Sequence, residues 1–178
     1  MESYIALLRG INVSGQKKIK MDDLRNYLEA LDFRNVQTYI QSGNIVFKHK
    51  KTPIINLEEL IKNKILEKYG FQVPVLIKTP AEVTSILNNI PFENIDYSKL
   101  YFTLLNEIPQ SALIDKLKEF SFPPEEYVIN GTSIYFYSPN GYGRAKMNNN
   151  FFEKKLKVKA TTRNWKTMNK LIEISQSV

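Results

Sequence analysis

The chain has 178 residues and a formal net charge of +7, and 43% of its residues are hydrophobic, 12% aromatic and 24% charged. This composition is that of a globular protein and excludes a disordered chain, a collagen-like repeat and a coiled coil. The absence of cysteine and the presence of one histidine, His49, exclude disulfides, thiolate chemistry and a histidine-rich metal site. No apolar run approaches the roughly 20 residues of a membrane helix, and residues 1–4 lack the basic flank of a signal peptide. We therefore expect a cytoplasmic protein without membrane contact.

The hydrophobic periodicity of the first half predicts the order strand, helix, strand, strand, helix, strand. The expected elements are a strand at 4–8, a helix at 21–31, strands at 36–40 and 45–49, a helix at 57–70 and a strand at 73–77. Segment 41–44 predicts the hairpin turn between the middle strands, because Gly43 and Asn44 adopt positive φ at low cost. Pro74 indicates that the last strand lies at a sheet edge or begins there.

The second half predicts the same order after a bridging helix at 79–88. The expected elements are a strand at 100–105, a helix at 109–120, a hairpin at 127–137, a helix at 145–157, a strand at 158–160 and a helix at 162–174. The hairpin is the clearest local signal, because Asn130 and Gly131 stand between two runs of β-forming residues.

Two successive βαββαβ units predict an α/β (α+β) protein made of two ferredoxin-like plaits packed into one compact body. We expect a first lobe at 1–78, a connecting helix and linker at 79–99, and a second, basic lobe at 100–178. The almost continuously apolar run at 4–8 further predicts that both faces of the first strand are covered, most simply by the other repeat.

The positive charge is concentrated at the C-terminal end of the sequence. Residues 1–139 contain 16 Lys/Arg and 16 Asp/Glu, whereas residues 140–178 contain nine basic residues and two acidic ones. Such an excess attracts phosphate-bearing partners through its summed field. The alternative is a solvated face that keeps the protein soluble.

Four segments resemble a bacterial family called domain of unknown function 1697. They are Leu8–Gly15 (LRGINVSG), Lys20–Met21, Thr38–Phe47 (TYIQSGNIVF) and Thr161–Thr167 (TTRNWKT). The resemblance spans essentially the whole chain and implies a cytosolic α/β protein of plait type. It implies no activity, cofactor or substrate. Ser14 departs from the family pattern, in which glycine is frequent.

The loop after the first strand is similar to a phosphate-binding loop but lacks its lysine. A P-loop needs Lys directly after its second glycine, and here Gln16 follows Gly15. A looser anion-binding turn remains, formed by backbone amides of this loop with basic side chains nearby. Its predicted members are the amides of Gly10, Asn12 and Gly15 and the side chains of Arg9, Lys17, Lys18 and Lys20. The alternative is a glycine turn with solvated lysines.

Two further segments predict anion binding in the second half. Arg144 and Lys146 precede a predicted helix, whose free amides favour an anion. The segment Thr161, Thr162, Arg163 and Asn164 predicts a threonine cap at the start of the last helix, with an exposed Arg163 as a charged fork. Trp165 is expected to pack inward rather than stack on a ligand. His49 is expected in polar, solvated surroundings.

Three functions are compatible with these patterns. The first is binding of an anionic small molecule or nucleic acid through the basic lobe, where strand aromatics such as Phe102 and Tyr135 could stack bases. The second is an enzyme for a phosphorylated or carboxylated small molecule between the lobes, using Arg9, Asn12, Arg144 and Arg163. The third is a structural or regulatory partner protein. No metal or cofactor is predicted, and the sequence assigns neither catalytic residues nor an oligomeric state.

Overall fold

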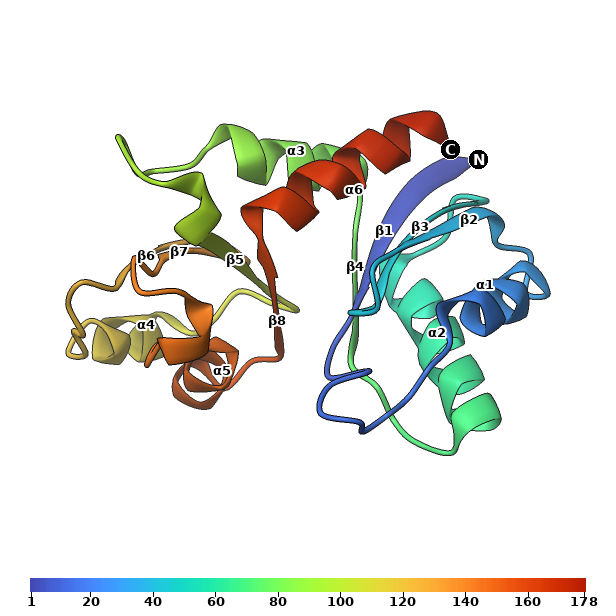
Figure 1. Ribbon diagram of the computed structural model, residues 1–178, viewed down its shortest axis with the longest axis horizontal. Helices are drawn as coiled ribbons and strands as arrows, with labels where there is room; N and C mark the ends of the chain where they lie inside the picture. The colour runs from blue at the N-terminus through green and yellow to red at the C-terminus, as the bar shows by residue number, and fades with distance from the viewer. The chain divides into compact units, whose positions relative to one another are not determined.

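The computed structural model describes residues 1–178 and divides the chain into two compact units (Figure 1). The first unit comprises Met1–Ser85 with Lys170–Val178, and the second comprises Ile86–Asn169. Each unit contains one four-stranded antiparallel sheet with helices. The protein is therefore a mixed α/β protein with two sheets. No helix is both long and apolar enough to cross a membrane.

The first unit has the predicted element order. Its elements are β1 (Glu2–Leu8), α1 (Met21–Glu29), β2 (Arg34–Tyr39), β3 (Asn44–His49), α2 (Ile54–Tyr69) and β4 (Val75–Lys78), followed by α3 (Pro80–Asn88) at the border of the two units. The sheet order is β2-β3-β1-β4, which confirms that the strand containing residues 75–77 lies at an edge. The α2 helix ends where predicted, because Gly70 adopts the left-handed conformation and donates its amide to Leu66.

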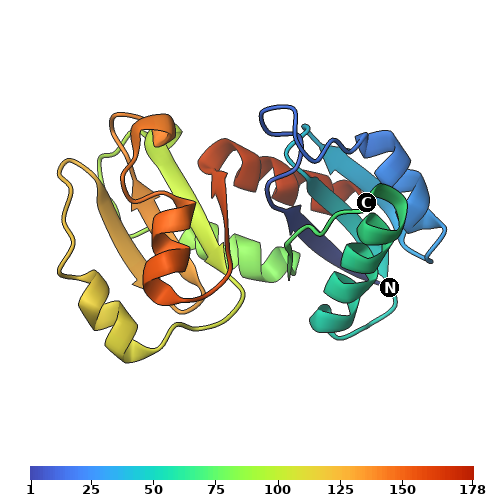
Figure 2. The same cartoon turned by 90° about the horizontal axis from the view of Figure 1, so that it is seen from below.

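Both faces of β1 are buried. Tyr4, Ala6 and Leu8 belong to the core beneath α1 and α2, and the helices contribute residues spaced three to four apart. Ile5 and Leu7, which point to the other face, are also fully buried. Figure 2 shows the C-terminal part of α6 (Trp165–Ser177) on that other face, and Lys170–Val178 belongs to the first unit.

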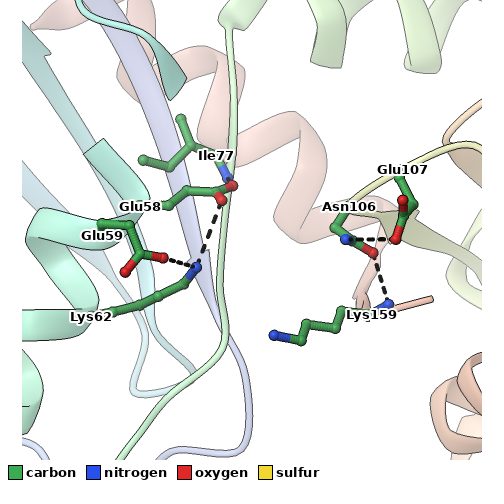
Figure 3. A network of polar contacts seen from close by, with 7 residues as sticks. All are labelled: Glu58, Glu59, Lys62, Ile77, Asn106, Glu107 and Lys159. Atoms are coloured by element: carbon green, nitrogen blue, oxygen red, sulfur yellow. Dashed lines mark hydrogen bonds and ion pairs between the residues drawn. The ribbon is translucent and has the colours of Figure 1, made fainter. Parts of the chain in front are cut away.

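The outer edge of β4 is closed by a side chain of α2 (Figure 3). The Ile77 amide donates a hydrogen bond of 3.0 Å to Oε1 of Glu58. The ammonium group of Lys62 lies 3.9 Å from Glu58 and 2.9 Å from Glu59. Burial raises the pKa of Glu58, and the Ile77 amide and Lys62 oppose this effect. This contact satisfies an edge amide that could otherwise pair with another strand.

The raised pKa of Glu58 predicts a pH-dependent contribution to stability. A carboxyl group with a raised folded-state pKa contributes most below its unfolded pKa, and this contribution is lost as the pH rises through the folded value. The free energy of unfolding of Glu58→Gln should therefore improve relative to wild type between about pH 4 and pH 7. Urea unfolding at both pH values measures this, with Glu59→Gln as the control for removing a neighbouring charge. A constant difference between wild type and Glu58→Gln would contradict the prediction.

The second unit repeats the order of the first. Its elements are η1 (Tyr97–Lys99), β5 (Leu100–Leu105), α4 (Ser111–Leu117), β6 (Glu126–Asn130), β7 (Ser133–Tyr137), η2 (Tyr142–Arg144), α5 (Asn149–Leu156), β8 (Ala160–Asn164) and the start of α6. The sheet order is β6-β7-β5-β8. The hairpin at 127–137 is confirmed, but Asn130 pairs with Ser133, so the two turn residues are Gly131, at φ +59°, and Thr132 rather than Asn130 and Gly131.

Four predicted elements in this unit have wrong boundaries. The α4 helix covers only Ser111–Leu117, and α5 begins at Asn149, because Asn148 caps it by accepting from the Phe151 amide. The last strand reaches Asn164 instead of Ala160. Residues 162–164 pair with β5 and therefore remain extended, so α6 begins at Trp165. Tertiary pairing overrides the local helical pattern here.

The sheet of the second unit has aromatic residues on both faces. On one face, Phe136 packs against Phe152 of α5, with ring centroids 5.9 Å apart. On the other face, Phe102 and Tyr135 are buried, and the Tyr135 hydroxyl donates to the Ile86 carbonyl at 3.0 Å. These two rings are therefore not accessible for base stacking, contrary to the nucleic-acid hypothesis.

The ends of β5 and β8 are held together by Asn106 (Figure 3). Its backbone amide donates to the Lys159 carbonyl at 3.0 Å, and its side-chain oxygen accepts from the Lys159 amide at 2.8 Å. The side-chain nitrogen of Asn106 donates to Glu107 at 3.3 Å. This asparagine fixes where β8 begins.

Candidate functional site

The loop between β1 and α1 has an unusual backbone. Gly10, Asn12, Ser14, Gly15 and Lys17 all have φ between +44° and +75°. Val13 and Gln16 form a short bridge in which the Gln16 amide donates to the Val13 carbonyl at 2.9 Å. Left-handed conformations are costly for residues other than glycine, so the surrounding structure must hold this loop in place.

Asn12 provides most of that support. Its side-chain oxygen accepts from the Ile19 amide at 2.8 Å, and its side-chain nitrogen donates to the carbonyls of Ile19 and Gln41 at 3.0 and 2.9 Å. The amide group of Asn12 is therefore committed to the loop and to the β2–β3 turn. Asn12 therefore positions the loop, and its backbone amide, which the sequence assigned to the anion-binding turn, donates to the Lys17 carbonyl at 3.2 Å.

Gly43 allows this loop to lie directly against the β2–β3 turn. A Cβ atom at Gly43 would lie 2.5 Å from Leu8 Cβ and 2.9 Å from Ile11 Cδ1, and φ is +80°. The Leu8 amide also donates to the Gly43 carbonyl at 2.8 Å. Only glycine fits this position without displacing β1.

These contacts create a cavity of about 600 Å³, called the Tyr69 cavity below. It lies between the β1–α1 loop, the start of α1, the β2–β3 turn and the end of α2. The cavity is lined by Asn12, Gly15, Lys18, Ile19, Lys20, Asp23, Gln41 and Tyr69. Four residues of the predicted anion-binding turn, Asn12, Gly15, Lys18 and Lys20, are thus brought together.

Tyr69 contributes a buried hydroxyl group without a hydrogen-bond partner. Its ring is held by Tyr27 and Phe71, with centroids 6.2 and 5.9 Å away. Burial raises the pKa of Tyr69, and the charge of Asp23 and the neighbouring Tyr27 add to this effect. The group therefore stays protonated and can donate a hydrogen bond. Unpaired buried hydroxyl groups are rare in native proteins.

The charge around the cavity is mixed. Lys18 and Lys20 are exposed cations, whereas Asp23 contributes one carboxylate. The α1 helix begins at Met21 without a side-chain cap, so the amides of its first turn add positive potential. Asp22, the neighbouring acidic residue, pairs with Arg25 at 3.2 Å.

The other two predicted side chains of this unit lie outside the cavity lining. The Lys17 ammonium donates to the Gln72 carbonyl at 2.8 Å and stands 6.0 Å from the Phe71 ring centroid. Arg9 is half-buried, and its backbone amide donates to the Pro74 carbonyl at 3.1 Å. Sequence reasoning missed Asp23, Gln41 and Tyr69 as members. Gln41 was missed because it lies in the segment 41–44, which is predicted as a hairpin turn. Tyr69 was missed because nothing in the sequence connects it to a loop some fifty residues earlier.

In the second unit, the backbone amides near Arg144 and Lys146 already hold a carboxylate. The amides of Lys146 and Met147 donate to the two oxygens of Glu125 at 2.8 and 2.9 Å. The Lys146 ammonium lies 5.3 Å from the Phe122 ring centroid, and Arg144 is exposed at the end of η2. The anion that this loop binds is therefore the Glu125 carboxylate of the same chain.

The segment Thr161–Asn164 is a strand and not the start of a helix. Thr162 hydrogen-bonds through its hydroxyl to Asn149 at 2.9 Å and to Thr103 at 2.8 Å. Arg163 is partly buried and donates to the Thr162 carbonyl at 2.9 Å, and burial lowers its pKa to about 10. Asn164 caps α6 by accepting from the Thr167 amide at 2.8 Å. The predicted threonine cap with an exposed arginine is therefore wrong.

A family model described as "Protein of unknown function (DUF1697)" matches residues 1–135. The chain belongs to this family. The DUF1697 match ends before the Thr161–Thr167 segment on which part of the resemblance rested. In this DUF1697 protein, three other segments of the resemblance meet at the Tyr69 cavity, through Asn12, Lys20 and Gln41.

A solved structure shows the same fold. It is described as "The structure of conserved bacterial protein SP0830 from Streptococcus pneumoniae", and it is 24% identical to this chain with a TM-score of 0.76. The alignment covers 97% of this chain and 98% of that one. No curated protein matches the chain.

The burial of His49 and Trp165 bears on two further predictions. His49 is 4% exposed and packs 5.0 Å from the Phe33 ring, so its predicted solvated surroundings are wrong. Its Nδ1 lies 3.0 Å from the Lys50 carbonyl and 3.1 Å from the Thr52 hydroxyl. The Trp165 ring packs against Tyr97 at 5.3 Å between centroids and is partly buried.

No group of three or more His, Asp or Glu side chains that could hold a metal ion occurs in residues 1–178.

The net positive charge is shared by the two units. The first contains 14 Lys/Arg and 10 Asp/Glu, and the second contains 11 and 8. Part of the basic C-terminal sequence lies in α6, whose last residues belong to the first unit. Counting along the sequence therefore overstated the charge difference between the two halves of the protein.

Proposed function

We propose that this DUF1697 protein binds a small molecule with a phosphate or carboxylate group in the Tyr69 cavity. The observation that carries the proposal is the buried Tyr69 hydroxyl, a donor without a protein partner, on a residue that lines one cavity together with Lys18 and Lys20. A buried donor is stabilised when a ligand oxygen accepts its hydrogen bond. The lysines supply the charge that an anionic oxygen requires.

The size and the charge pattern of the cavity restrict the ligand. A volume of about 600 Å³ is within the range of roughly 300 to 1,000 Å³ that is usual for small-molecule sites. Asp23 repels an anion from one part of the cavity and accepts hydrogen bonds there. The ligand that fits has an anionic group near the lysines and a hydroxyl or amino group near Asp23.

Calorimetric titration with phenyl phosphate and with inorganic phosphate tests this function. Tyr69→Phe removes only the hydroxyl and should weaken phenyl phosphate binding about tenfold, because a hydrogen bond to a charged group contributes about 1.5 to 3 kcal/mol. Lys20→Ala should have an effect of similar size. Tyr97→Phe and Lys51→Ala, which alter exposed residues elsewhere, are the matched controls. The proposal fails if neither probe binds at millimolar concentration, or if all four variants bind like wild type.

We infer further that each unit is a ferredoxin-like plait and that the chain arose by duplication. The support is the shared element order, strand-helix-strand-strand-helix-strand, together with equivalent sheet orders β2-β3-β1-β4 and β6-β7-β5-β8. The two units then differ in function, because only the first combines a cavity with an unpaired buried tyrosine hydroxyl.

A further inference from the structure

We propose that a groove between α4 and α5 of the second unit docks an acidic segment of a partner protein. The groove has a volume of about 270 Å³. It is lined by Leu113, Lys116, Leu117, Glu119, Phe120, Lys154 and Lys155. This surface, the α4–α5 groove, is separate from the Tyr69 cavity in sequence and in unit, and it does not depend on the function proposed above.

The floor of the groove is apolar. Leu113 and Leu117 lie one helical turn apart on α4, and Phe120 follows the helix. Leu117 is buried, whereas Leu113 and Phe120 are half-buried and so remain partly accessible. Phe120 is fixed by an edge contact with Phe151 at 5.7 Å between centroids. A rigid apolar floor of this kind accepts an apolar anchor side chain.

The rim of the groove is cationic. Lys116 and Lys154 are exposed, and Lys155 lies over Phe120. Glu119 is the one carboxylate of the lining, and the nearby Asp115 pairs with Lys118 at 2.7 Å. Three cations against one anion favour a partner with Asp and Glu side chains, because complementary potentials speed association and exclude other partners.

The volume of the groove and the position of Lys155 over the Phe120 ring favour a peptide as its ligand over a small molecule or a nucleic acid. A volume of about 270 Å³ is below the usual range for small ligands and suits one leucine-sized or phenylalanine-sized side chain. Binding of single-stranded nucleic acid relies on accessible aromatic faces. Here the Lys155 ammonium stands 3.7 Å from the Phe120 centroid and covers that face. It can remain there while it accepts a partner carboxylate as its counter-ion.

Fluorescence anisotropy with a labelled acidic peptide tests this surface. The probe is a peptide of about twelve Asp and Glu residues with one central leucine, and its comparison peptide has serine in place of the leucine. We expect the leucine peptide to bind at least about fivefold more tightly to wild type. Lys116→Glu combined with Lys154→Glu, and separately Leu113→Asp, should each weaken binding about tenfold or more. Lys51→Glu is the control for a charge reversal in the other unit.

Either of two kinds of result would overturn the proposal. The first is equal binding of the two peptides, or unchanged binding after Leu113→Asp. The second is tighter binding of an oligouridine that is lost with the double lysine reversal and retained with Leu113→Asp, which would assign the surface to nucleic acid. Because Lys154 and Lys155 also lie in the last turn of α5, where cations stabilise a helix, thermal unfolding of each variant confirms that it remains folded.

Discussion

Replacement of Gly43 by alanine is expected to lower the free energy of unfolding by about 3 kcal/mol or more. Two costs add in this variant. The residue would retain φ near +80°, and its new methyl group would lie 2.5 Å from Leu8 Cβ. Because Leu8 Cβ is attached directly to the backbone of the central strand β1, it cannot rotate away as a flexible side chain could. Urea unfolding followed by circular dichroism measures the loss.

Gly70→Ala is the matched control, because it measures only the cost of placing alanine in the left-handed backbone conformation. Gly70 lies in the same unit with φ +72°, but no atom lies within 4 Å of the position that a Cβ would take there. This variant should lose only about 1 to 2 kcal/mol, the cost of a left-handed alanine. Equal losses in the two variants would show that the close approach of Gly43 to Leu8 and Ile11 is unimportant.

Asn12→Ala is expected to lower the free energy of unfolding by about 2 to 4 kcal/mol. The substitution removes all three side-chain hydrogen bonds that join the β1–α1 loop to Ile19 and Gln41. It also places alanine at φ +55°, where asparagine is better tolerated. The same unfolding experiment applies, and binding in the Tyr69 cavity should be lost together with the loop geometry.

Asn12→Gly separates the two contributions. Glycine accepts the positive φ without cost, so this variant loses only the hydrogen bonds. A loss of about 2 kcal/mol or more in Asn12→Gly assigns the effect to those bonds. If Asn12→Gly is as stable as wild type, the side chain of Asn12 does not hold the loop.

The sequence was sufficient for elements whose signals are local. Alternating and helical patterns of apolar residues predicted the element order, and the Asn130–Gly131 pair predicted a hairpin that the register confirms. Gly70 likewise marked the end of α2 correctly. In each case one or two neighbouring residues determine the backbone conformation, so no information about distant parts of the chain is needed.

The candidate site required information that local patterns do not contain. Tyr69 lines a cavity with residues of the β1–α1 loop only because α2 packs on the same sheet face as α1. The segment 161–164 has the composition of a helix start, yet pairing with β5 makes it a strand. Contacts between residues far apart in sequence decided both outcomes.

The Glu125 carboxylate, which belongs to the same chain, competes with free anions for the backbone amides of the loop before α5. It occupies the amides of Lys146 and Met147 at 2.8 and 2.9 Å and is supplied by the same chain, so its effective concentration there is on the order of millimolar or higher. A free phosphate must outcompete that local concentration and leave Glu125 without its partners. A cluster of basic residues and backbone amides can therefore mark where a protein has bound its own carboxylate. Under the function proposed above, we expect free anions to bind more readily at the Tyr69 cavity, because no internal acceptor occupies the tyrosine hydroxyl.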